Sequence, residues 1–286
     1  MQISFNKKNR TFRLDTENVS YAMMIGPSGE IRHLYYGAAL GKDDDVSGLA
    51  HRFDRAFSPN PEGLTPDTSL NIACLEYTAF GSGDFHNAAL ALRKENGTAV
   101  TSAVYKSHVI TKGKAPLPGL PASFAPEKEV QTLEITLADS FSGAEIVLRY
   151  SVFADSDVIA RSVKVVNPTR QTIRIEKLMS AELDFDSCSF DMLYLQGKWA
   201  RERHAFRTPL QPGMQGFRSA RGSTGHQYNP GVVFAEKSAA ERHGDVYGML
   251  LLYSGSYAVE VEVDEYESVR AMLGVNSENF TWNLKP

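Results

Sequence analysis

Asp54 is the first residue whose surroundings suggest chemistry. It stands between Arg52 and Arg55 and is followed by the stiff turn Ser58-Pro59-Asn60-Pro61. A carboxylate in a loop of this kind can accept hydrogen bonds from the hydroxyl groups of a sugar. The same residues also fit a solvated loop on which Asp54 only pairs with a neighbouring guanidinium. Composition alone leaves both interpretations open.

Trp199 is the second residue of this kind. It lies in the segment 196–204, among lysine, arginine, glutamate and histidine side chains. The C–H face of a sugar stacks on an aromatic ring while its hydroxyls seek polar partners, so this mixture suits a carbohydrate. A tryptophan near the end of a strand can equally belong to the core.

The remaining chemistry-bearing residues predict no catalyst. The segment 217–230 contains Gly222-x-x-Gly225 but no Walker lysine, and we interpret it as an ordered surface loop. The carboxylate pairs Asp184/Asp186 and Asp264/Glu265 are interpreted as solvated surface charges rather than as the two acids of a glycosidase. The seven histidines lack the spacing of a zinc site, and no nucleophile elbow is present. We therefore expect no catalytic residue, no metal site and no cofactor.

Composition excludes several classes of partner. The formal net charge of −4 is small for 286 residues, and basic residues are interspersed with acidic ones. This pattern argues against nucleic acid and against a membrane as the main partner. No apolar leader follows Met1, and no stretch is long enough to span a bilayer. With only two cysteines, Cys74 and Cys188, we expect no disulfide and a cytoplasmic protein.

Short segments of alternating apolar residues, separated by turns, must position these side chains. Such spacing is typical of a β-sandwich or barrel, and no long window has the period of an amphipathic helix. We predict one large, antiparallel, all-β sandwich with few short helices. Strands are expected at residues 11–14, 21–25, 30–36, 131–137, 145–153, 158–166, 172–178, 247–253 and 257–263, with long irregular stretches at 38–80 and 197–230.

Several motifs follow one another in order along the chain. They are His33-Leu34-Tyr35-Tyr36-Gly37, Asp54-Arg55-Ala56-Phe57-Ser58-Pro59-Asn60-Pro61, Glu76-Tyr77, Gly83-Asp84-Phe85, Leu117-Pro118-Gly119-Leu120-Pro121, Gly197-Lys198-Trp199-Ala200-Arg201-Glu202-Arg203 and Phe280-Thr281-Trp282-Asn283-Leu284. Over essentially its whole length the chain resembles the N-terminal β-sandwich domain of bacterial family 36 glycoside hydrolases. These are the α-galactosidases that cleave melibiose- and raffinose-type sugars.

The resemblance implies a supersandwich of the galactose-mutarotase-like kind for residues 1–286. It implies a catalytic (β/α)8 barrel after residue 286, which supplies two aspartates for the retaining hydrolysis of terminal α-galactosides. Asp54 and Trp199 match positions that reach the substrate pocket, and in homotetramers of the family such loops can complete the site of a neighbouring subunit. The chain by itself is then expected to be inactive and to shape the pocket and the oligomer.

Two departures from the family pattern and two other functions bear on this expectation. Leu64-Thr65-Pro66-Asp67 stands where relatives often have an arginine, and His86 replaces the arginine after Gly-Asp-Phe. A freestanding carbohydrate-binding β-sandwich is the main alternative, and it should bind galactosides unaided. A sugar-ring isomerase would need a histidine facing a carboxylate in a cleft, and the sequence identifies no such pair among the seven histidines. If a barrel is missing, exposed apolar surface should cause self-association.

Overall fold

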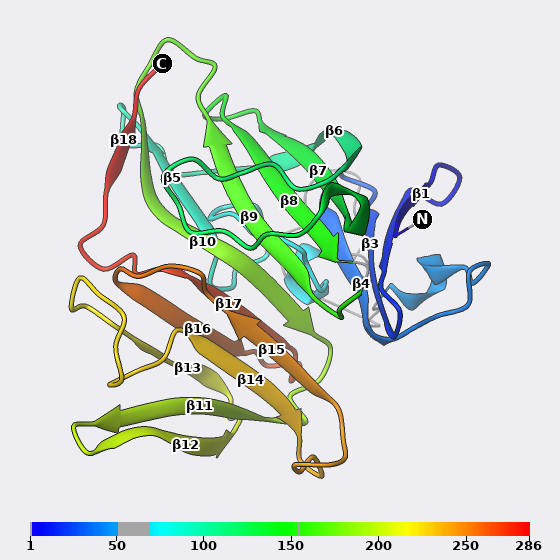
Figure 1. Ribbon diagram of the computed structural model, residues 1–286. Helices are drawn as coiled ribbons and strands as arrows, with labels where there is room; N and C mark the ends of the chain where they lie inside the picture. Colours follow the sequence, from blue (N-terminus) through cyan, green and yellow to red (C-terminus); the bar gives the residue numbers. More distant parts are fainter. Residues whose placement is uncertain (1, 51–68, 154) are drawn as a thin grey trace. The chain divides into compact units, whose positions relative to one another are not determined.

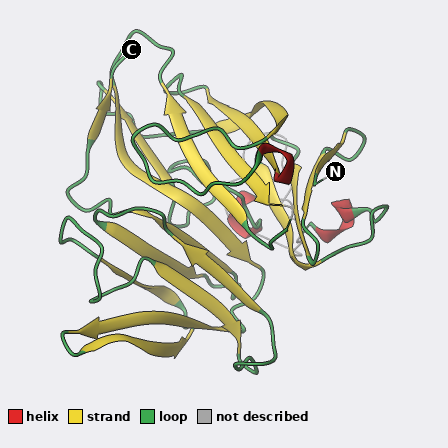
Figure 2. Ribbon diagram, viewed as in Figure 1, coloured by secondary structure: helices red, strands yellow, loops and turns green. Residues whose placement is uncertain are grey.

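The structure is a computed structural model that describes residues 2–50, 69–153 and 155–286. Strands dominate this part of the chain, and its helices are short 3-10 turns (Figure 2). These turns are η1 Val46–Leu49, η3 Leu70–Ile72 and η4 Glu127–Glu129. The chain forms two compact units, Met1–Glu176 with Trp282–Pro286, and Lys177–Thr281. The prediction of an antiparallel, all-β chain with few short helices is confirmed.

The first unit contains two antiparallel meanders (Figure 1). One consists of β1 Ile3–Asn6, β2 Thr11–Asp15, β3 Val19–Ile25 and β4 Ile31–Ala38, in that order. The other consists of β6 Ala103–Lys112, β7 Val130–Asp139, β8 Glu145–Phe153 and β9 Ile159–Val166. The two sheets meet in one core, where the ring of Phe12 on β2 packs edge-on against His108 on β6 at 4.9 Å between centroids.

Alternation of side chains explains why these strands form. In β7 the residues Leu133, Ile135 and Leu137 are almost completely buried, while Glu134 and Thr136 between them are only partly covered. Successive side chains of a strand point to opposite faces, so this pattern gives one apolar face. Burying each such leucine or isoleucine contributes about 1.5–3 kcal/mol.

The second unit also has two sheets. The first has the order β13-β16-β17-β10, with β13 Gly213–Arg218, β16 Tyr257–Val263, β17 Val269–Val275 and β10 Ile173–Phe185. The second has the order β12-β11-β14-β15, with β12 Arg201–Pro209, β11 Phe190–Lys198, β14 Gly231–Glu236 and β15 Val246–Leu250. Aromatic contacts join them, including Phe185 to Phe234 at 5.6 Å between ring centroids.

Strand β10 passes from one unit into the other. Residues Ile173–Ile175 pair with β18 Trp282–Leu284 in the first unit, where β5 Leu90–Lys94 also pairs with β10. Residues Met179–Phe185 pair with β17 in the second unit. A register shift between Met179 and Ala181 marks the start of the second ladder.

The expectation of an irregular stretch over residues 197–230 is wrong, because β12 and β13 lie within it. β12 is an edge strand with exposed side chains almost throughout, and its sequence RERHAFRTP is rich in charge. An edge strand that buries no face needs no apolar alternation, and charged side chains are common there. The hydrophobic pattern therefore gave no signal for it.

Candidate functional site

Trp199 lies at the tip of the β11–β12 hairpin, and 85% of its surface is exposed. Lys198 pairs with Arg201, so Trp199 and Ala200 form the two-residue connection between the strands. Burial of an indole is strongly favourable, so an exposed one on an ordered hairpin is available for an external partner. The interpretation of Trp199 as a core residue is therefore wrong.

Close backbone packing shapes this hairpin. The register shifts between Gln196 and Lys198, and the backbone of Arg203 is left-handed, with φ 58°. Gly197 lies against this irregularity, since a Cβ atom there would be 2.2 Å from the Arg201 carbonyl oxygen. Only glycine allows such an approach.

The other side of β11 is anchored by the segment 227–229. The Gly197 N–H donates to the Gln227 carbonyl at 3.2 Å, and the Asn229 N–H donates to the Leu195 carbonyl at 3.1 Å. Below the hairpin, aromatic rings stack in a row that contains Phe206, Tyr194, Phe217 and Tyr228, with centroid distances of 5.0–5.6 Å. Strand β11 is thus held on both edges, by β12 and by the segment 227–229, and the rings of Tyr194 and Phe206 continue into the stack with Phe217.

Glu202 supplies a carboxylate next to the exposed indole. Its Oε1 accepts the backbone N–H of Ala200 at 2.8 Å. Backbone N–H groups of Glu202 and Ala200 lower the pKa of Glu202, and the charges of His226 and His204 lower it further. The hairpin therefore places an ionised carboxylate, which closes its turn, beside an exposed aromatic face of the kind on which a sugar can stack.

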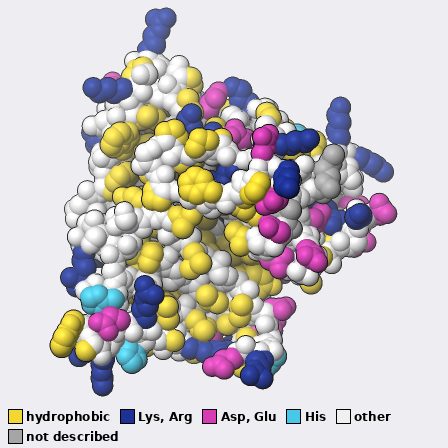
Figure 3. All heavy atoms as spheres, viewed as in Figure 1, with side chains coloured by type: hydrophobic (Ala, Val, Ile, Leu, Met, Phe, Trp, Pro, Cys, Tyr) yellow, Lys and Arg dark blue, Asp and Glu magenta, His cyan; other side chains and the backbone are white. Residues whose placement is uncertain are grey.

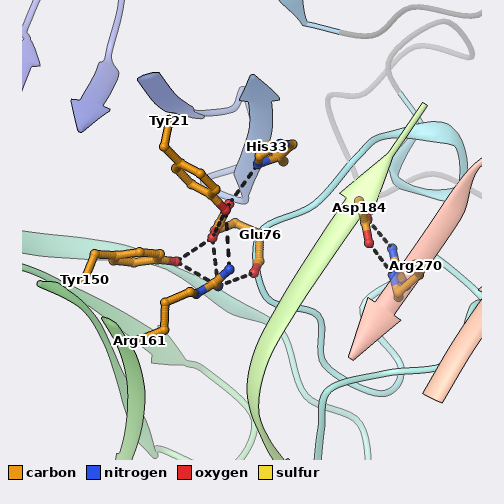
Figure 4. A network of polar contacts seen from close by, with 7 residues as sticks. All are labelled: Tyr21, His33, Glu76, Tyr150, Arg161, Asp184 and Arg270. Atoms are coloured by element: carbon orange, nitrogen blue, oxygen red, sulfur yellow. Dashed lines mark hydrogen bonds and ion pairs between the residues drawn. The ribbon is translucent and has the colours of Figure 1, made fainter. Parts of the chain in front are cut away.

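A second cluster lies buried in the first unit around Glu76 (Figure 4). Glu76 Oε1 is 2.7 Å from Arg161 Nη2 and accepts hydrogen bonds from the hydroxyls of Tyr21 at 2.7 Å and Tyr150 at 2.8 Å. The other oxygen, Oε2, contacts the Tyr21 hydroxyl at 2.8 Å and Nδ1 of His33 at 3.3 Å. The side chain of Glu76 is completely buried.

Charge and burial act in opposite directions on this cluster. Burial raises the pKa of Glu76, but the Arg161 guanidinium and the hydrogen bonds from His33 and Tyr21 outweigh it and hold the pKa below its ordinary value. Burial, followed by the negative charge of Glu76, raises the pKa of Tyr21 well above its ordinary value. The cluster therefore contains an ionised carboxylate and a neutral phenol at neutral pH.

The Glu76 cluster is suited to holding the chain in place. A carboxylate offers about four acceptor positions, and those of Glu76 are occupied by four side chains, which leaves no room for a reacting group. Its own backbone is also fixed, because the Glu76 N–H donates to Ile31 and the His33 N–H donates to Cys74. Sequence reasoning noted Glu76 only within a motif; the signal for its role was a glutamate in the apolar context Cys74-Leu75-Glu76-Tyr77.

The interpretation of Asp184 as a solvated surface charge is wrong, because the structure buries it. It is 4% exposed. On the neighbouring strand, directly opposite, Arg270 contacts both of its oxygens at 3.1 and 3.0 Å and contacts Glu182 at 3.2 Å. The carboxylates of Asp184 and Glu182 share the buried guanidinium of Arg270, so Asp184 helps to hold strand β10 against strand β17.

Asp264 belongs to the second carboxylate pair. It caps a turn by accepting the N–H groups of Tyr266 and Ser268.

The other predicted features have mixed outcomes. Asp54 lies outside the described residues. The interpretation of segment 217–230 as an ordered surface loop holds only in part: Phe217 and Arg218 belong to β13, while further along Ser219 Oγ donates to the Ser223 carbonyl and the Thr224 N–H donates to the Ser254 carbonyl. Cys74 and Cys188 form no disulfide.

The described part of the chain offers neither a metal-binding group nor a membrane-spanning helix. In residues 2–50, 69–153 and 155–286, no group of His, Cys, Asp and Glu side chains could hold a metal ion. No helix in the described part is long and apolar enough to cross a membrane.

Comparison with known proteins gives one consistent family. Residues 29–285 match the model described as the glycosyl hydrolase family 36 N-terminal domain. The bifunctional alpha-galactosidase/sucrose kinase AgaSK of Mediterraneibacter gnavus is 42% identical over 99% of this chain, which spans 30% of that protein. Alpha-galactosidase AgaA of Geobacillus stearothermophilus is 38% identical over 100% of this chain, which spans 39% of it.

Solved structures agree with the sequence comparison. The crystal structure of alpha-galactosidase AgaB from Geobacillus stearothermophilus superposes with a TM-score of 0.94 at 38% identity, covering 100% of this chain and 39% of that one. The galactosidase domain of AgaSK superposes with a TM-score of 0.95 at 42% identity, covering 99% of this chain and 39% of that one. The chain thus spans 30–39% of the relatives named here.

Proposed function

Because the chain belongs to the family 36 glycosyl hydrolase N-terminal domains, we propose that it is the non-catalytic N-terminal part of an α-galactosidase. The exposed indole of Trp199 on a supported hairpin is the observation that carries this proposal. Such a surface can bind and orient a sugar. The chemistry then belongs to another part of the whole protein.

The whole protein, in this proposal, hydrolyses terminal α-galactosides of the melibiose and raffinose type by a retaining mechanism. A (β/α)8 barrel after residue 286 carries the two catalytic aspartates and packs against this chain. Support comes from the relatives, which are much longer than this chain, and from a structure of AgaA in complex with raffinose. We also propose a homotetramer, as the family resemblance implies, and a cytoplasmic location, in keeping with the few cysteines.

Asp54 and Trp199 are the proposed substrate-binding residues. Trp199 stacks on the C–H face of the sugar, and Asp54 accepts its hydroxyls. Support for Trp199 is its exposure and the rigid hairpin; support for Asp54 is the motif that it shares with the family. No metal or cofactor takes part in this binding.

For the architecture we propose a β-sandwich of the supersandwich, galactose-mutarotase-like kind. The supporting observation is that each unit contains antiparallel sheets whose apolar residues meet in a core. Sheets that pack face to face in this way are the usual solution for chains of alternating strands. Residues 1–286 then form one functional domain built from two compact units.

Hydrolysis of a chromogenic α-galactoside tests the function. We expect no activity from residues 1–286 and activity from the same chain extended through the proposed barrel. Activity of the short chain would contradict the proposal. If the extended chain were also inactive while the short one bound galactosides tightly, a freestanding carbohydrate-binding module would be the better interpretation.

A further inference from the structure

The turn that carries Trp199 has an unfavourable backbone conformation. Ala200 adopts the left-handed region with φ 61°, which side chains other than glycine enter only at a cost. Trp199 itself is 85% exposed, so packing of the indole contributes little to fixing the turn. Some other contact must therefore hold Ala200 in this conformation.

Glu202 provides that contact. Its Oε1 accepts the Ala200 N–H at 2.8 Å, which closes the turn from the side chain two residues further along. A hydrogen bond donated to an ionised acceptor is roughly twice as strong as one between neutral groups. The backbone of β12 at Glu202 packs closely against Gly197. This contact fixes the Cα atom from which the Glu202 side chain extends.

We propose that Glu202 is a positioning residue for Trp199, which holds the Ala200 turn and so aims the indole at the sugar. The inference rests on the proposed function, because it takes Trp199 as the sugar-binding ring. Glu202 acts through the backbone and does not touch the sugar. Its amide analogue can accept the same N–H, whereas alanine cannot.

Fluorescence of Trp199 tests the positioning without any sugar. The chain has two tryptophans, so Trp282→Phe leaves Trp199 as the sole tryptophan in residues 1–286, and excitation at the red edge of the indole band selects it over the tyrosines. In that background we expect Glu202→Ala to enlarge the fast, nanosecond component of the anisotropy decay and Glu202→Gln to preserve the parent decay. Glu241→Ala, at an exposed position between β14 and β15, is the matched control and should change nothing. An unchanged decay in Glu202→Ala would overturn the inference.

Kinetics of the barrel-containing protein then connect positioning to binding. We expect Glu202→Ala to raise KM for an α-galactoside about threefold to tenfold, the loss typical of one hydrogen bond, with kcat and Tm unchanged. Glu202→Gln should restore KM. If Glu202→Gln were as impaired as Glu202→Ala, the charge itself would contact the sugar and the positioning role would be wrong; an unchanged KM in Glu202→Ala would also overturn it.

Trp199→Ala separates this inference from the function on which it rests. If Trp199→Ala leaves KM unchanged, the proposed sugar-binding role of Trp199 fails, while the anisotropy decay still decides whether Glu202 holds the turn. If Trp199→Ala raises KM and Glu202→Ala changes neither KM nor the decay, the role of Glu202 fails and the function stands.

Discussion

Arg161 Nη2 lies 2.7 Å from Glu76 Oε1, and the two residues form a buried ion pair between β9 and the segment that precedes β5. Arg161 also donates to the Glu76 carbonyl at 3.2 Å and lies 4.8 Å from the centre of the Tyr150 ring. The guanidinium thereby fixes both the side chain and the backbone of Glu76. The first unit depends on this pair for the placement of a segment that has little regular structure.

Glu76→Gln should lower the free energy of unfolding by about 3–5 kcal/mol, because it leaves the Arg161 charge buried without its anion. Chemical denaturation measures the loss. Tyr150→Phe, which removes one donor to Glu76, is the milder variant and should cost about 1 kcal/mol. Glu134→Gln is the control: its pair with Arg149 is partly exposed and should cost less than about 1 kcal/mol. Equal losses of unfolding free energy in Glu76→Gln and Glu134→Gln would show that the buried Glu76–Arg161 pair contributes no more than the partly exposed Glu134–Arg149 pair.

Stability should fall in acid, in part through Glu76. Its pKa in the folded chain is held below its value in the unfolded chain, which is about 4.3. The corresponding stabilisation is present above about pH 4.3 and is lost as the pH falls through the folded pKa. The free energy of unfolding should therefore decrease between pH 6 and pH 3.5, and less steeply in Glu76→Gln. Identical pH profiles for both proteins would exclude Glu76 as a source of the dependence.

Gly197→Ala should disturb the β11–β12 hairpin, because the new Cβ atom would lie 2.2 Å from the Arg201 carbonyl oxygen. Overpacking of this kind typically costs about 1–3 kcal/mol. Gly248→Ala is the matched control in the same sheet, where the nearest atom to a Cβ is Val233 Cγ2 at 3.9 Å, an ordinary contact. Thermal unfolding compares the two, and a loss no larger for Gly197→Ala than for Gly248→Ala would contradict the packing argument.

Residues 1–286 should self-associate through the outer face of the β12-β11-β14-β15 sheet. Alternation and register place Leu193, Leu195, Val233, Val246 and Leu250 on that face. Leu250 is 81% exposed and Val246 57%, and Figure 3 shows hydrophobic side chains gathered over β14 and β15. An apolar face of this kind normally contacts a partner.

Leu250→Glu should therefore reduce the mass measured by light scattering towards the monomer value of 31.6 kDa. Phe124→Glu replaces a residue that is 86% exposed in the first unit and should leave self-association unchanged. If the unaltered chain were a monodisperse monomer, the exposed apolar face would not cause self-association and the prediction would be wrong.

Trp199→Ala in the barrel-containing protein should raise KM for an α-galactoside about tenfold or more, since stacking of a ring on an indole contributes roughly 1–3 kcal/mol. Tm should change by less than about 2 °C, because the side chain is exposed and packs on little. A fall in Tm with unchanged KM would identify Trp199 as a structural residue.

The sequence by itself determined the class of fold and the family. Strands such as β7 and β8 were predictable because their side chains alternate between apolar and polar, a signal that is local in the chain. Trp199 was also a candidate from sequence, because an indole beside polar residues suits a sugar and because its motif resembles the family's, but composition alone did not exclude a place in the core.

Only the tertiary structure decided which of the charged residues are buried and which contacts hold the hairpin. The buried ion pairs of Asp184 and Glu76 are made with Arg270 and Arg161, which are 86 and 85 residues away in the chain. Edge strand β12 escaped prediction because it buries no apolar face. The support of the Trp199 turn by Glu202 depends on a left-handed backbone at Ala200, which residue types alone do not specify. Long-range pairing and backbone conformation are set by the packed chain as a whole, so a local pattern could not have predicted them.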